Sequence, residues 1–230
     1  MLWYKDWLET RGKMLFALLI TFFPVVMLRN KAALNAGIGE WAGQIATLSF
    51  FWTIVPLFLA GSGIKTQTLL AKRGLHASMY YTLSLPVSRL RLFATRATLG
   101  FIEAAAILAL VPFAMPFLFP ALRNSVTEMT LLEYWLTFIV CSTVFYSIGL
   151  VLSTFLDDLT QNWTSLVIII LMWSGAKSLH LPASLDVFSA VGKNSPLFTH
   201  SLPWAPMGVA IAAAAILCTT ASRIVSAREY

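Results

Sequence analysis

Charged side chains are scarce in this chain of 230 residues: they make up 11% of it, whereas a soluble domain carries about a quarter. Hydrophobic residues account for 58%, and a water-soluble fold of this length has too little interior to bury so many. The composition therefore excludes a soluble globular protein and predicts an integral membrane protein. Because backbone polar groups must be paired inside lipid, its long apolar runs predict an all-α fold.

The chain also lacks the patterns typical of enzymes and metal sites. Its two cysteines, Cys141 and Cys218, lie in separate apolar runs, and we interpret them as ordinary buried thiols. No GxxxxGKS or GxxxxGKT loop is present, and the three histidines, His76, His180 and His200, are scattered in the sequence. We expect no catalytic residue, metal site or cofactor in this chain itself.

Six apolar runs predict about six transmembrane helices. They are Met14 to Leu28, Ile45 to Gly63, Ala97 to Phe119, Tyr134 to Phe155, Trp163 to Ser174 and Met207 to Ala221. Most approach the ~20 residues that cross a bilayer, and the fifth departs furthest because its tail becomes polar. No internal repeat or linker divides the chain, so residues 1–230 are predicted to form a single transmembrane domain.

Basic residues predict the orientation of these helices. With the N-terminus inside, eleven of the 16 Lys and Arg residues fall on inner segments and five on outer ones. The positive-inside rule then predicts an N-in, C-in, multi-pass protein of the inner (cytoplasmic) membrane. Because the basic residues flank apolar runs, the net charge of +6 suits anionic headgroups, and we expect no nucleic-acid partner.

Two polar segments on the inner side have amphipathic patterns. In residues 1–13, Trp3, Tyr4 and Trp7 fall on one side of a helix, which predicts a helix lying in the inner interface; a plain extension of the first span is the alternative. Residues 64–96 are too long for a tight turn. We interpret them as a short amphipathic helix, a break at Ser84-Leu85-Pro86 and a second helical turn, with a solvated, membrane-anchoring loop as the alternative.

Two shorter connections carry local signals. The outer segment 177–206 holds four prolines among apolar residues, which predicts short helices that dip into the outer leaflet and return. The inner turn before the fifth run contains Asp157, Asp158 and Thr160, and we expect Asp158 or Thr160 to cap the helix that follows.

Polar and small residues also occur inside the predicted spans. Glu103 lies about two turns into the third span, where an ionised carboxylate is costly, so it is expected to face protein, water or a cation and not lipid. It could pair with Arg96 or Arg89, be protonated in the core, or line a substrate route. In the fourth span, small residues such as Gly149 and Ser153 predict close helix packing.

Three of these stretches resemble the ABC-2-type permease family, the membrane subunits of ATP-driven ABC exporters. The opening Trp3-Tyr4-Lys5-Asp6-Trp7-Leu8-Glu9-Thr10-Arg11 is similar to that family's interfacial elbow helix. Residues 74–89, with the run LSLPVSR, are similar to its coupling segment after the second span, and the proline-broken segment matches its outer re-entrant half-helices in position. The resemblance covers nearly the whole chain, but the soluble extracellular domain and the fused nucleotide-binding domain of larger members are missing.

The resemblance implies a permease dimer, formed with a second copy or a homologue and clasped by ABC ATPase subunits that hold ATP and Mg. It implies export, with a hydrophobic or amphiphilic substrate. Residues implied to contact the ATPase are Leu75, His76, Ser78, Tyr80, Tyr81, Leu83, Leu85, Pro86 and Arg89, with Asp157 and Asp158 in a smaller contact. Residues implied to lie in the membrane interface are Trp3, Tyr4, Trp7 and Arg11.

Two functions of other classes stay open at this point. One is a membrane-embedded lipid-modifying enzyme or its anchor subunit, although such chemistry usually needs a cluster of acids, histidines or metal ligands. The other is a non-transporting scaffold or immunity-type membrane protein, for which six spans would suffice.

Epitope tags at both termini test the predicted orientation. In right-side-out vesicles, both tags are expected to resist external protease, because both ends face the cytoplasm. Permeabilised vesicles, in which the protease reaches both tags, serve as the control. Cleavage of either tag from outside would contradict the N-in, C-in topology.

Overall fold

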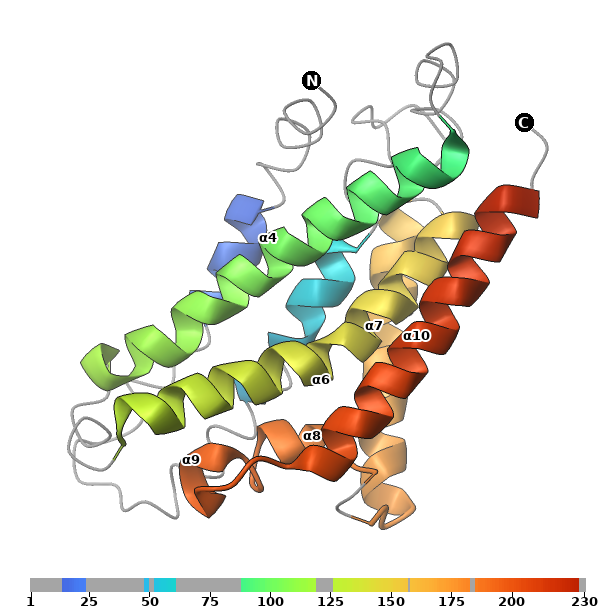
Figure 1. Ribbon diagram of the computed structural model, residues 1–230. Coiled ribbons are helices and arrows are strands. Elements are labelled where there is room, and N and C mark those ends of the chain that lie inside the picture. Colours follow the sequence, from blue (N-terminus) through green and yellow to red (C-terminus); the bar gives the residue numbers. More distant parts are fainter. Residues whose placement is uncertain are drawn as a thin grey trace.

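The computed structural model describes residues 14–23, 48–49, 52–60, 88–118, 126–156, 158–182 and 185–227 (Figure 1). Its helices are α4 (Arg89–Leu118), α6 (Glu128–Phe155), α7 (Asp158–Ser178), α8 (Val187–Val191), α9 (Pro196–Thr199) and α10 (Trp204–Ala227). Met14–Phe23 and residues 52–59 are also helical. No strand occurs in the described ranges, so the all-α prediction is confirmed.

Within the described part of the chain, three helices are long and apolar enough to cross a membrane, which indicates a membrane protein. They are Phe93–Phe113 within α4, Glu128–Phe155 and Trp204–Ala227. These correspond to the third, fourth and sixth predicted spans. The fifth predicted span lies in α7, which has 21 residues but a more polar composition. Of the first two, the structure describes only Met14–Phe23 and the helical residues around 52–59.

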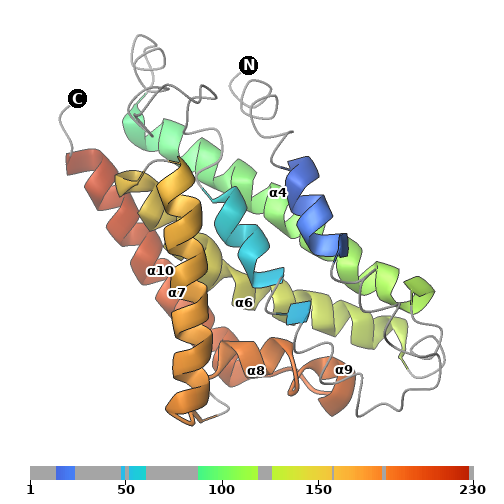
Figure 2. The same ribbon diagram turned by 180° about the vertical axis from the view of Figure 1, so that it is seen from behind.

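Successive long helices run in alternating directions, as both ribbon views show (Figures 1 and 2). At one end of the bundle α4 and α7 begin and α6 and α10 finish; we call this the α4-entry end. At the other end α7 finishes, α10 begins, and the short helices α8 and α9 lie (the α8–α9 end). The connections therefore divide between two opposite ends.

Helix α6 is the centre of the described bundle, because it contacts α4, α7, α8, α9 and α10. In its most apolar stretch 61% of the residues are buried, against 22% in α10. Thr127 caps its start by accepting a hydrogen bond from the backbone N–H of Thr130. The hydroxyls of Ser142 and Ser153 donate to carbonyls within α6, so the burial of these two side chains leaves neither donor unpaired.

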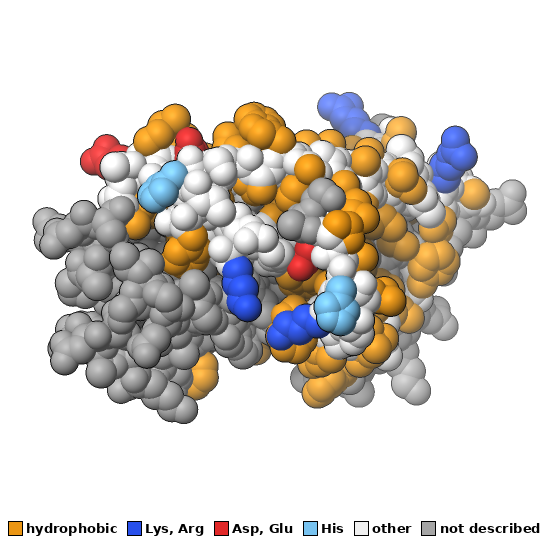
Figure 3. Space-filling model, turned by 90° about the horizontal axis from the view of Figure 1, so that it is seen from below, with side chains coloured by type: hydrophobic (Ala, Val, Ile, Leu, Met, Phe, Trp, Pro, Cys, Tyr) orange, Lys and Arg blue, Asp and Glu red, His pale blue; other side chains and the backbone are white. Residues whose placement is uncertain are grey.

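The segment between α7 and α10 contains two short helices. Helix α7 ends with His180 in the left-handed conformation, where the N–H of Leu181 bonds back to the carbonyl of Ala176. Asp186 then caps α8, and Pro196 opens α9. Both helices pack on α6, with Val191 and Leu197 in the same apolar core as α6 residues. On this end, a few charged side chains stand among hydrophobic and uncharged ones (Figure 3).

The prediction of short helical pieces in residues 177–206 is therefore confirmed, and their apolar side chains face protein. The capping prediction for the fifth helix is wrong for Thr160. Helix α7 already begins at Asp158, so Thr160 lies inside its first turn and cannot precede it. Asp158 is itself the first helical residue.

Helix α6 and the helix at 52–59 cross very closely at Gly149. A Cβ added there would lie 2.6 Å from the Cβ of Ala60 and 2.8 Å from the carbonyl oxygen of Leu57. Neither is the end of a flexible side chain, so only the absence of a side chain permits this approach. The prediction of close packing by small residues in the fourth span is confirmed at this position.

The substitution Gly149→Ala is expected to destabilise the protein by about 1–3 kcal/mol, the usual cost of overpacking a well-packed contact. Gly208→Ala in α10 is the matched control, because a Cβ at Gly208 meets no atom within 4 Å and alanine favours the helix. Thermal unfolding of both variants in detergent measures the difference. Equal melting temperatures for the two variants would show that the crossing is not tight.

Candidate functional site

Most of the predicted ATPase-contact residues lie outside the described residues. These are Leu75, His76, Ser78, Tyr80, Tyr81, Leu83, Leu85, Pro86 and Asp157. The predicted membrane-interface residues Trp3, Tyr4, Trp7 and Arg11 lie outside them as well. The candidate sites that the structure does describe are the starts of α4 and α7, and the polar groups between the helices.

Arg89 and Asp158 are the first residues of α4 and α7. Both helices begin at the α4-entry end, where α6 and α10 also finish (Figures 1 and 2). The described parts of the two segments singled out in the sequence, residues 88–96 and 158–162, therefore lie at the same end of the bundle. This arrangement allows a single partner to contact both.

Glu103 lies on the inner face of α4, and its side chain is only 4% exposed. Arg96, seven residues earlier and thus on the same face, is also buried, although it was expected at the inner membrane edge. Both side chains interact with other groups of the protein. The expectation that Glu103 does not face lipid is confirmed, and a lipid-facing carboxylate is excluded.

Tyr146 of α6 joins α4 next to Glu103. Its hydroxyl donates a hydrogen bond of 2.7 Å to the carbonyl of Ala97, and its ring packs edge-on against Phe101 at 5.4 Å. Gly100 leaves the space for this hydroxyl, because a Cβ there would lie 2.7 Å from it.

A second contact links α6 to α10 beside Tyr146. The thiol of Cys218 lies 3.6 Å from the hydroxyl oxygen of Ser147. Tyr146 and its neighbour Ser147 thus link α6 to α4 and to α10 through polar contacts. Such groups inside a membrane helix bundle hold helices in fixed register.

A third polar link starts from α7. The side-chain amide of Gln161 is fully buried and donates two hydrogen bonds, 3.1 Å to the carbonyl of Ala60 and 3.0 Å to that of Gly149. Gln161 therefore joins α7, α6 and the helix at 52–59 at one point. Sequence reasoning missed both Tyr146 and Gln161; the signal was a polar side chain within or beside an apolar run.

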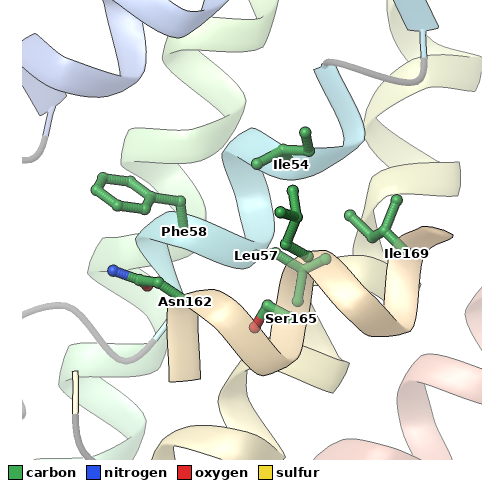
Figure 4. Close-up of a pocket in the computed structure, with 7 residues that line it drawn as sticks. Ile54, Leu57, Phe58, Asn162, Ser165 and Ile169 are labelled. Carbon is green, nitrogen blue, oxygen red and sulfur yellow. The ribbon is translucent and has the colours of Figure 1, made fainter. Parts of the chain in front are cut away.

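A small cleft separates the helix at 52–59 from α7. Phe58, Leu57 and Ile54 line one side, and Asn162, Ser165 and Ile169 the other (Figure 4). The Ser165 hydroxyl is buried, and the described residues offer it no hydrogen-bond partner. The cleft is therefore mostly apolar, with two polar side chains from α7.

The described residues contain no group of three or more His, Cys, Asp and Glu side chains that could hold a metal ion. His180 and His200 are exposed, at the end of α7 and the end of α9. Cys141 is buried, as expected, whereas Cys218 is half-buried; both are free thiols. What this region offers is fixed interhelical hydrogen bonds, which position helices.

Comparison of the chain with protein-family models, curated proteins and solved structures finds no match.

Replacing Tyr146 with phenylalanine is expected to lower stability by about 0.5–2 kcal/mol, because the interhelical hydrogen bond to Ala97 is lost. Tyr134→Phe is the matched control on the same helix. Its hydroxyl is equally buried but has no hydrogen-bond partner in the described part of the chain, so its removal is expected to be neutral or stabilising. Melting temperatures in detergent compare the two. A larger loss for Tyr134→Phe would refute the role assigned to Tyr146.

Proposed function

We propose that this chain is the membrane-spanning permease subunit of an ATP-driven ABC transporter. The ATPase is a separate subunit that carries ATP and Mg, and this chain forms a dimer with a second copy or a homologue in the inner (cytoplasmic) membrane. The transporter exports a hydrophobic or amphiphilic substrate. The chain supplies the route and the moving helices, and its partner supplies the energy.

The observation that carries this proposal is the separation of two specialised ends. The segments that resemble ATPase contacts meet the bundle at the α4-entry end, through the starts of α4 and α7. The short helices α8 and α9, which resemble re-entrant half-helices in position, lie at the opposite end. A transporter needs this polarity, because energy enters on one side of the membrane and substrate leaves on the other.

The outer surfaces of the helices support a location inside lipid. Helix α10 exposes Val209, Ile211 and Ile216, and α7 exposes Val167 and Leu171. Exposed apolar side chains of this kind are costly in water and favourable against acyl chains. At the end of α7, Lys177 lies 3.6 Å over the ring of Trp173, a pairing suited to the headgroup region.

When the partner ATPase moves the helices, the contacts between the helices must also be kept. The polar links of Tyr146 and Gln161 tie α4, α6, α7 and the helix at 52–59 into one unit. Such a unit can shift as a body between two arrangements when nucleotide binds the partner. This supports a coupling role. For Glu103, which is buried on the inner face of α4, we propose a structural role.

Affinity purification of the tagged full chain from its native membranes in mild detergent tests the proposal. A stoichiometric ABC ATPase is the expected co-purifying protein. An intrinsic activity on lipid without an ATPase would indicate the enzyme alternative. The absence of both would indicate a scaffold.

The double substitution Tyr80→Ala with Tyr81→Ala is expected to leave the protein folded but to uncouple ATP hydrolysis from transport. Truncation of two aromatic anchors at a contact typically costs about 2 kcal/mol or more, that is, roughly thirtyfold in affinity for the ATPase. Trp204→Ala, an exposed aromatic residue at the start of α10, is the control at the other end of the bundle. The amount of ATPase retained on the tagged chain measures the loss of affinity. Equal retention by wild type and the tyrosine variant would rule out these anchors.

A further inference from the structure

Gln161 makes the most connected polar contact among the described residues of α7. Its amide is 0% exposed and reaches the carbonyls of two different elements, Ala60 at 3.1 Å and Gly149 at 3.0 Å. One side chain therefore fixes three helices relative to one another. The sequence distance is large, since Ala60 lies 101 residues before Gln161.

The two carbonyls that Gln161 binds differ in whether their own helix provides a hydrogen-bond donor. Gly149 lies in the middle of α6, where its carbonyl is already engaged in the helix. Ala60 directly follows the helix at 52–59, and none of the described residues of that helix can donate a helical hydrogen bond to its carbonyl. Gln161 thus completes the end of that helix, and the close crossing at Gly149 brings the end within reach.

An apolar cluster supports the contact of α6, α7 and the helix at 52–59 around Gln161, which we call the joint. Leu57, Phe145 and Ile169 are buried together, one from each of the three elements that Gln161 connects. The hydrogen bonds of Gln161 fix the relative orientation of the three helices, while the apolar contacts fix the distances between them. The end of the helix at 52–59 is therefore held firmly against α6 and α7.

This joint lies directly before residues 61–87, which contain the segment expected to contact the ATPase. We propose that Gln161 is a positioning residue: it holds the exit of the helix at 52–59 against α6 and α7, so that a displacement that the partner ATPase imposes on the chain beyond Ala60 is passed to those helices. The inference rests on the proposed function, and it names the residue through which coupling enters the bundle.

The first test uses the chain alone. Cysteines replace Phe58 and Asn162, which line the cleft from the helix at 52–59 and from α7 (Figure 4), in a background lacking Cys141 and Cys218. With Gln161→Met, which keeps the side-chain length but removes both donors, cross-linking by a short reagent is expected to fall about threefold or more. That is the size of effect of losing one or two interhelical hydrogen bonds.

Ser165→Ala is the matched control. It removes a buried polar group one turn further along α7, whose hydroxyl has no hydrogen-bond partner among the described residues. Its cross-linking is expected to equal that of wild type. Gln161→Glu serves if Gln161→Met fails to fold, because a buried carboxyl stays protonated, keeps one donor and should give an intermediate yield.

The second test uses the complex with the co-purified ATPase. A cysteine replaces Leu179, an exposed residue just beyond the end of α7, and its labelling rate is measured with and without trapped nucleotide. Wild type and Ser165→Ala are expected to respond to nucleotide. Gln161→Met is expected to retain ATP hydrolysis but to lose about threefold or more of this response.

The outcomes separate the two proposals. Unchanged cross-linking in Gln161→Met would overturn the positioning role whatever the partner is. Changed cross-linking with an unchanged nucleotide response would overturn the coupling role while the proposed function stands. A wild-type preparation without any ATPase would overturn the proposed function, and with it the coupling role, before any variant is made.

Discussion

The close crossing of α6 and the helix at 52–59 at Gly149 is the contact on which the rest of the bundle depends. With no side chain at this position, backbone meets backbone, and the carbonyls of Ala60 and Gly149 come near enough for one amide to bind both. A Cβ would separate the helices and leave the carbonyl of Ala60 without its donor. The position of α7 follows from this contact, because Gln161 is the residue that joins it to the other two.

Inside a membrane, attraction between helices has to come from packing and polar pairing, since lipid is as apolar as the side chains. This chain combines packing and polar pairing at the same helix contacts. Tyr146 reaches α4 where Gly100 makes room, and Gln161 reaches two carbonyls where Gly149 makes room. Each polar link is therefore paired with a glycine on a facing or neighbouring helix. Small residues set the distance, and hydrogen bonds set the register.

The functional proposal depends on the two ends of the bundle being different. The α4-entry end gathers the starts of α4 and α7, which follow the two inner segments of the sequence. The α8–α9 end is closed by short helices whose apolar residues join the core of α6. Between them lies a layer of fixed interhelical contacts. A partner acting at the first end would therefore move several helices together, which is the requirement for coupled transport.

The sequence by itself determined the membrane location, the all-helical class and the positions of the helices α4, α6 and α10, because hydropathy and helix propensity act locally. It also determined that Glu103 avoids lipid, since an exposed carboxylate there is too costly. It failed at Thr160, where helix α7 began earlier than the capping pattern indicated. Only the tertiary structure decided the burial of Arg96 and the roles of Tyr146 and Gln161. Their partners lie 49 and up to 101 residues away, and no local pattern specifies which carbonyl a distant donor will meet.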